Sequence, residues 1–177
     1  MQLSDSLKSF IRDVPGFPKP GIVFKDITPL LEEPQVVKEV VRALAYPYRG
    51  KPVDAIAAIE ARGFLFGFLL ASELSVPFIP IRKLGKLPYK KITEKYVLEY
   101  DEAAVEMHED AVKKGWHVVI HDDLLATGGT ANAAGQLVQR LGGTVAGFSF
   151  IIHLQFLDGA RLLKKNYNCG PHYLISY

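Results

Sequence analysis

Residues 118–130 read VVIHDDLLATGGT, and this is the most informative segment of the sequence. Its apolar first half is typical of a buried strand, which runs into the acid pair Asp122 and Asp123. A Thr-Gly-Gly-Thr turn then opens a helix that we predict over residues 130–141. In open α/β sheets, ligands bind at the carboxyl ends of the strands, and a helix N-terminus at such an end favours an anion. The stretch therefore predicts an anion site, with phosphate as the usual occupant.

The turn and the acid pair together indicate the class of ligand. Backbone N–H groups and hydroxyls of residues 127–130 would point at one spot, where the glycines allow a close approach. The two carboxylates would repel that phosphate, so Asp122 and Asp123 suit hydroxyl groups or a Mg²⁺ ion that bridges to other phosphates. The Gly-Lys-Ser/Thr of a Walker A loop is missing after the glycines, as is a G-x-G-x-x-G fingerprint. The expected ligand is a sugar phosphate accompanied by a metal ion.

Strand and helix patterns alternate along the rest of the chain. Helices are predicted over residues 4–13, 34–45, 63–74 and 158–165, and strands over residues 53–59, 76–82, 103–108 and 144–152. This alternation predicts an α/β domain with a parallel sheet that helices cover on both faces. The basic stretch at residues 83–95, KLGKLPYKKITEK, interrupts the pattern and is expected to be a functional loop, although a solvated hairpin would have the same composition.

Composition and charge exclude several classes of protein. Hydrophobic residues make up 49% of the 177 residues and charged residues 23%, which is typical of a folded domain and not of a disordered chain. With 21 Lys and Arg against 19 Asp and Glu, and no basic block, nothing demands nucleic-acid binding. No apolar run is long enough for a membrane helix, and residues 1–10 have no signal-peptide core. The single cysteine, Cys169, cannot form an intramolecular disulfide, so we expect a cytoplasmic location.

Four segments, in one order along the chain, resemble a known family. VVIHDDLLATGGT resembles the motif by which type I phosphoribosyltransferases bind 5-phosphoribosyl-1-pyrophosphate (PRPP), and its Leu-Leu-Ala is similar to the branch that uses adenine. Residues 17–26, FPKPGIVFKD, resemble the family's N-terminal hood, and residues 60–64, EARGF, resemble its pyrophosphate loop. Residues 82–88, RKLGKLP, and 96–100, YVLEY, resemble the two ends of its flexible catalytic loop. The resemblance spans most of the chain, from about residue 17 to residue 152.

This resemblance implies a fold and a reaction. The fold would be that of a type I phosphoribosyltransferase, a central, mostly parallel sheet flanked by helices in one domain over residues 1–177. A small hood would cover about residues 1–35, and a flexible loop about residues 83–100. The reaction would join adenine to PRPP, giving AMP and pyrophosphate in purine salvage, with Mg²⁺ as cofactor. The resemblance further implies a homodimer, with neither a nucleic acid nor a membrane as partner.

The resemblance also implies roles for individual residues. The 5'-phosphate of PRPP would be held by the turn residues Ala126, Thr127, Gly128, Gly129 and Thr130. Pyrophosphate would be bound by the cations Arg62, Arg82, Lys83 and Lys86, with a strained turn, often a non-proline cis peptide in this fold, at Glu60-Ala61. Adenine would lie against Val23, Phe24 and Lys25. The catalytic set would be Glu99, Tyr100, Asp122 and Asp123, and Mg²⁺ would be held mainly through the substrate, with Asp122 and Asp123 as its candidate protein ligands.

Three positions depart from the family's pattern. Lys25 stands where the family commonly has arginine, and lysine offers a point charge in place of a planar fork. His121 replaces an aliphatic residue before the acid pair, and strand alternation places it on one face with Val119 and Asp123. Such a histidine is either a metal ligand or pH-sensitive partner of the acid, or a structural histidine, and the structural interpretation is favoured. Asp101 stands where glycine often follows the Leu-Glu-Tyr segment.

Two alternatives to an adenine-using enzyme remain at this point. One is a sister enzyme that uses xanthine, guanine or orotate, against which the hood segment argues. The other is a PRPP-sensing regulatory module that binds nucleic acid. Such modules lose the catalytic loop, whereas this chain retains Arg82, Lys86, Glu99 and Tyr100.

Overall fold

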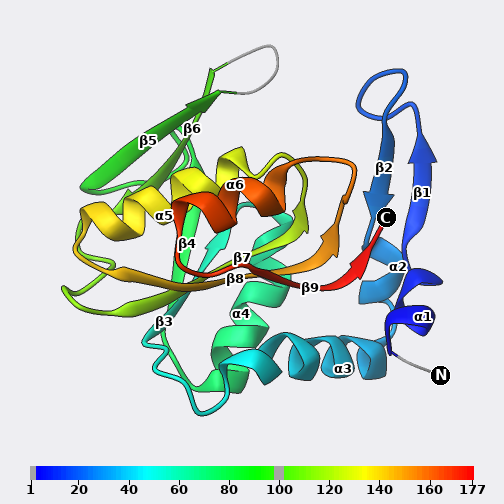
Figure 1. The fold of residues 1–177 in the computed structure, drawn as a ribbon, viewed down its shortest axis with the longest axis horizontal. Helices are drawn as coiled ribbons and strands as arrows, with labels where there is room; N and C mark the ends of the chain where they lie inside the picture. The colour runs from blue at the N-terminus through cyan, green and yellow to red at the C-terminus, as the bar shows by residue number, and fades with distance from the viewer. Residues whose placement is uncertain (1–2, 98–101) are drawn as a thin grey trace.

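A seven-stranded mixed sheet forms the centre of the molecule. The computed structural model describes residues 3–97 and 102–177 (Figure 1). The central strand β3 (Ala55–Ile59) pairs in parallel with β4 (Phe78–Lys83) on one side and β7 (His117–Leu125) on the other. On the β7 side, β8 (Thr144–His153) and β9 (Pro171–Ser176) continue the parallel sheet, while beyond β4 the strands β6 (Glu102–His108) and β5 (Lys91–Val97) are antiparallel. The predicted central, mostly parallel sheet is thus confirmed, with the strand order β5-β6-β4-β3-β7-β8-β9.

Helices cover both faces of this sheet, because its strands are apolar on both sides (Figure 1). Val118 and Ile120 of β7 lie in one core with the helices α5 (Gly129–Arg140) and α6 (Gly159–Asn166). Val119, between them, lies in the other core with α3 (Pro34–Ala45) and α4 (Arg62–Leu74). The 3-10 helix η1 (Tyr46–Tyr48) follows α3. Within the described residues, every helix is too short or too polar to cross a membrane.

A small hood stands beside the main sheet (Figure 1). It consists of α1 (Leu3–Lys8), the antiparallel strands β1 (Arg12–Pro15) and β2 (Val23–Asp26), and α2 (Thr28–Leu31). The predicted helix over residues 4–13 was therefore too long. Residues 12–15 pair with 23–26 in a ladder, and Gly16 turns the chain with a φ of +76°.

Besides β1 and β2 of the hood, two strands were missed by the sequence analysis. The segment expected as a loop over residues 83–100 contains β5, whose Ile92 and Tyr96 pack on the core, while Thr93, Glu94 and Lys95 lie between them. Because β5 forms the edge of the sheet, β6, predicted as a strand over residues 103–108, is an interior strand. Strand β9 lies in the stretch after residue 166, where no motif was recognised. Glu99, Tyr100 and Asp101 lie outside the described residues, so what the sequence implies for them stays a prediction.

Candidate active site

The predicted phosphate turn lies at the carboxyl end of β7 and at the start of α5. Gly128 adopts a φ of +82°, which favours glycine, and a Cβ at this position would lie 3.0 Å from the Cα and the oxygen of Gly159. Helix α5 has no side-chain cap at its N-terminus, so the first N–H groups of the helix are available to a ligand. Residues 126–130 and Asp122 line a cavity of about 70 Å³ at this helix end. The structure thus gathers the predicted phosphate residues around an anion site.

The two aspartates of the acid pair lie in different surroundings, because successive strand residues point to opposite faces. Asp122 faces the cavity, and its Oδ1 accepts a hydrogen bond from the backbone N–H of Asp123 at 2.9 Å. The first residues of α4 pack closely against the Asp122 side chain, since a Cβ on Gly63 would lie 2.8 Å from Asp122 Oδ1. Asp123 is buried, and its Oδ2 forms an ion pair with Arg62 Nη2 at 2.9 Å.

Burial changes the protonation of this acid pair. Desolvation and the charge of Asp123 raise the pKa of Asp122 well above its ordinary value. Desolvation also raises the pKa of Asp123, and the guanidinium of Arg62 opposes this effect. The carboxyl groups of the pair can therefore form hydrogen bonds with ligand hydroxyl groups. Their ionised form is unfavourable unless a nearby cation compensates its charge.

The residues of the site also bear on the expected Mg²⁺ ion. Across residues 3–97 and 102–177, nowhere do three His, Cys, Asp or Glu side chains gather in a way that could hold a metal by themselves. Asp122 and Asp123 supply two hard oxygen donors beside the phosphate turn. This donor set fits a Mg²⁺ ion that keeps most of its ligands from substrate phosphates and water.

Arg62, predicted to bind pyrophosphate, joins the acid pair to the hood. Its Nη1 donates a hydrogen bond to the carbonyl oxygen of Lys25 at 2.9 Å, and its guanidinium lies 4.4 Å from the ring centre of Phe24. The preceding Glu60-Ala61 peptide bond is cis, as the resemblance implied. The structure therefore brings together residues predicted for pyrophosphate, for adenine and for the ribose.

The side chain of Lys25 points away from this junction. Its Nζ lies 2.6 Å from Asp13 Oδ1 and 3.6 Å from the ring centre of Tyr177. Lys25 therefore offers its backbone to the site and not its charge. Of the other residues predicted for adenine, Phe24 has Phe17 against it edge-on at 5.1 Å, and Val23 is exposed.

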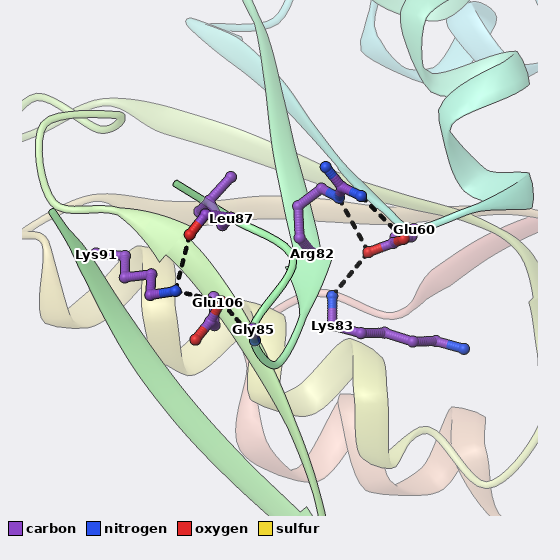
Figure 2. A network of polar contacts seen from close by, with 7 residues as sticks. All are labelled: Glu60, Arg82, Lys83, Gly85, Leu87, Lys91 and Glu106. Atoms are coloured by element: carbon purple, nitrogen blue, oxygen red, sulfur yellow. Dashed lines mark hydrogen bonds and ion pairs between the residues drawn. The ribbon is translucent and has the colours of Figure 1, made fainter. Parts of the chain in front are cut away.

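The remaining cations lie at the end of β4 and in the turn that follows. Arg82 forms two hydrogen bonds with the Glu60 carboxylate, at 3.0 and 3.2 Å, and the backbone N–H of Lys83 donates a third at 2.9 Å (Figure 2). These hydrogen bonds lower the pKa of Glu60, and the bond from the Arg82 side chain has the largest effect. The Lys83 side chain runs away from this pair (Figure 2). Within the described part of the chain, the ammonium groups of Lys83 and Lys86 contact no acceptor.

A second cluster, which the sequence analysis missed, anchors this basic turn. Glu106 of β6 is 2% exposed, and its Oε2 accepts a hydrogen bond from the Gly85 N–H at 3.1 Å (Figure 2). The same oxygen lies 3.0 Å from Lys91 Nζ, which donates to the Leu87 carbonyl at 2.8 Å. A glutamate inside the alternating apolar pattern of residues 103–108 was the available signal.

His121 is fully buried against α4, where a Cβ on Gly67 would lie 3.4 Å from its ring. Neither ring nitrogen has a hydrogen-bond partner among the described residues, and desolvation lowers its pKa to about 3. A neutral, enclosed ring supports the structural interpretation over a metal ligand.

Comparison with known proteins identifies the class to which this site belongs. Residues 27–169 match the phosphoribosyl transferase domain, and the chain belongs to this family of pentosyltransferases. The adenine phosphoribosyltransferase of Cytophaga hutchinsonii is 51% identical over 157 residues, which cover 89% of this chain and 87% of the relative. Within the family, the chain belongs with the adenine phosphoribosyltransferases.

Solved structures agree with this placement. The crystal structure of adenine phosphoribosyltransferase from Thermoanaerobacter pseudethanolicus has a TM-score of 0.93 and 47% identity, and the match covers 99% of this chain and 100% of that one. The Saccharomyces cerevisiae enzyme, solved with adenine and an imino-altritol bisphosphate, has a TM-score of 0.89 and 35% identity over 97% of this chain and 98% of its own.

Proposed function

We propose that this chain transfers the phosphoribosyl group of PRPP to adenine, releasing pyrophosphate and forming AMP. The observation that carries the proposal is the meeting of three parts at one end of β7. These parts are the anion cradle of residues 126–130, the acid pair, and Arg62 stacked on Phe24. Each part suits one portion of the two substrates, namely the 5'-phosphate, the ribose hydroxyls, and the pyrophosphate with the base.

Binding follows from the charge and shape of these parts. The N–H groups at the start of α5 and the hydroxyls of Thr127 and Thr130 hold the 5'-phosphate. Asp122, which lines the cavity, faces the ribose hydroxyls directly, and the charge of Asp123, paired with Arg62, acts on the ribose from behind it. Phe24 supplies an aromatic face for the purine, and the main chain around Val23 reads its edge.

The reaction breaks the bond from the ribose C1' to a pyrophosphate oxygen and forms a bond from C1' to a purine nitrogen. Positive charge develops on the ribose as the bond breaks, and the acid pair stabilises it. Arg62, Arg82, Lys83 and Lys86 stabilise the negative charge of the departing pyrophosphate. Glu99, placed by the sequence motif, receives the proton that leaves the purine, and Tyr100 caps the site. When bound, a Mg²⁺ ion would be held mainly by the substrate phosphates, with Asp122 and Asp123 as its candidate protein ligands, and it would supply charge neutralisation at the pyrophosphate.

We also propose a cytoplasmic homodimer, formed through the outer face of α4. On this face Leu65, Phe68 and Leu69 are 45%, 61% and 38% exposed, and Phe68 packs edge-on against Phe78 at 5.8 Å. Apolar residues three and four positions apart form one stripe of a helix, and an exposed stripe of this kind marks a protein contact. A second copy of the chain would cover the stripe, and Arg82 would then reach pyrophosphate in the neighbouring subunit. A reducing compartment would leave Cys169 as the free thiol seen here.

A coupled assay with PRPP, Mg²⁺ and each base in turn, following pyrophosphate release, tests the function. Turnover with adenine alone supports the proposal, whereas turnover with another base overturns the specificity and keeps the chemistry. PRPP binding without turnover would instead support the regulatory alternative. An Asp123→Asn variant should remain folded and lose most of its turnover, and wild-type activity in that variant would contradict the role of the acid pair.

A further inference from the structure

Tyr177 follows β9 and lies between two lysines of the hood. Its backbone is fixed to the main sheet, since its N–H donates to the His153 carbonyl at 3.0 Å and its oxygen accepts from the Gln155 N–H at 2.8 Å. Its ring centre lies 3.6 Å from Lys25 Nζ and 5.2 Å from Lys8 Nζ. Figure 1 shows the end of β9 against the base of the hood. Tyr177, which is fixed to the main sheet, thus provides an aromatic surface for two lysines of the hood.

Lys25 depends on this surface because it is buried. The residue is 8% exposed, and a buried ammonium group is costly unless other groups compensate its charge. Asp13, directly across the β1–β2 ladder, provides the ion pair at 2.6 Å. The Tyr177 ring provides the second contact through its negative face, which the aliphatic side chain of a leucine could not do.

The backbone of Lys25 transmits this constraint to the site. The Lys25 carbonyl accepts the hydrogen bond from Arg62 at 2.9 Å, and the neighbouring Phe24 ring stacks on the same guanidinium at 4.4 Å. A shift of Lys25 along β2 would therefore move the proposed adenine surface and release one end of Arg62.

We propose that Tyr177 is a positioning residue for the adenine-binding strand, acting as a latch that holds Lys25 and, through it, Phe24 and Arg62. The latch is a contact between the ring and the buried ammonium group, so Tyr177→Phe keeps it and Tyr177→Leu removes it. Its effect on adenine rests on the function proposed above.

Steady-state kinetics of these two variants test the consequence of the latch. Tyr177→Leu should raise the KM for adenine about fivefold, the factor that corresponds to a cation–π contact of about 1 kcal/mol. Tyr177→Phe should stay close to wild type, as should Tyr46→Leu, a control at a tyrosine that is 77% exposed. Equal effects of the leucine and phenylalanine variants would overturn the proposal.

A double-mutant cycle separates the latch from general stability. If Tyr177 acts through Lys25, then Tyr177→Leu should change the KM for adenine less than about twofold in a Lys25→Met background. The full fivefold effect in that background would refute the latch. Should Tyr177→Leu fail to fold, Asp13→Asn removes the other contact that holds the Lys25 ammonium group, and it should also raise the KM for adenine. An unchanged KM would contradict the step from Lys25 to the adenine surface.

Hydrogen exchange tests the latch without any assay of activity. In the substrate-free protein, backbone amides of residues 12–26 should exchange faster in Tyr177→Leu than in Tyr177→Phe, with β3 and β7 unchanged. Equal exchange in the hood of the two variants would contradict the latch. If wild type failed to turn over adenine, the proposed function would fall, while this comparison would still decide whether Tyr177 holds the hood.

Discussion

His121 provides a test of how a buried histidine affects stability in this fold. The ring is fully buried, its nitrogens have no partner within the described residues, and burial lowers its pKa to about 3 from an ordinary value of 6.5. Between these values the unfolded chain binds a proton that the folded chain excludes. The free energy of unfolding therefore falls as the pH is lowered from 6.5 towards 3. From pH 7.0 to pH 5.5 this one group should cost about 1.3 kcal/mol of stability.

The substitution His121→Leu removes this dependence, because leucine does not titrate. Urea titrations followed by circular dichroism at pH 7.0 and pH 5.5 give the loss of unfolding free energy in each protein. Wild type should lose about 1.3 kcal/mol more than the variant. His153 and His172 have pKa values that burial also lowers, but they are present in both proteins and cancel in the difference. The control His108→Gln should retain the wild-type dependence, and identical losses in wild type and His121→Leu would refute the reasoning.

Three further predictions concern the site. Gly128→Ala should lower kcat/KM for PRPP at least about tenfold in steady-state assays, because a φ of +82° costs a non-glycine residue about 1–2 kcal/mol and the new Cβ would press on Gly159. Gly63→Ala should lower kcat with little change in melting temperature, since the added Cβ would displace the Asp122 carboxylate that now lies 2.8 Å from that position. Glu106→Gln should lower the melting temperature and raise the KM for PRPP, because Lys91 loses its buried partner and the turn that bears Lys86 loses its anchor; unchanged calorimetry would contradict this role.

The central sheet could be predicted from the sequence because its signals are local. The apolar run before the acid pair, the glycines after it and the proline at residue 34 each define an element within a few residues, and α3 begins and ends where predicted. The phosphate turn could be placed for the same reason, since a strand, a turn and a helix that follow one another bring the first N–H groups of the helix to the carboxyl end of the strand.

The two strands of the hood, as well as β5 and β9, could not be predicted from local patterns, because pairing with distant residues decides them. Residues 12–15 form a strand only because residues 23–26 lie opposite them. Ile92 and Tyr96 bury one face of β5 against the core, but lysines dominate the composition of the segment. The latch at Tyr177 shows the same limit, since it joins two residues 152 positions apart that no local pattern relates.

The charges around the proposed pyrophosphate site divide into two kinds. Arg62 and Arg82 are each paired with an acid, Asp123 and Glu60, so they add little net charge and their guanidinium groups are held in place. The ammonium groups of Lys83 and Lys86 form no ion pair in the described part of the chain, and Lys83 acts on Glu60 only through its charge, so these two lysines attract anions from solution. Replacing both Lys83 and Lys86 with glutamine should therefore weaken pyrophosphate binding strongly at about 0.05 M salt. The same double substitution should weaken it much less at about 0.5 M salt, where exposed charges are screened.

Replacing Arg82 with glutamine should instead lower kcat at either salt concentration. The guanidinium group of Arg82 is paired with Glu60, so it acts on the pyrophosphate through an oriented, direct contact that salt does not screen. Calorimetry of pyrophosphate binding and steady-state kinetics separate the two cases. A salt-independent loss from the lysine pair would show that these side chains also make direct, oriented contacts with the anion.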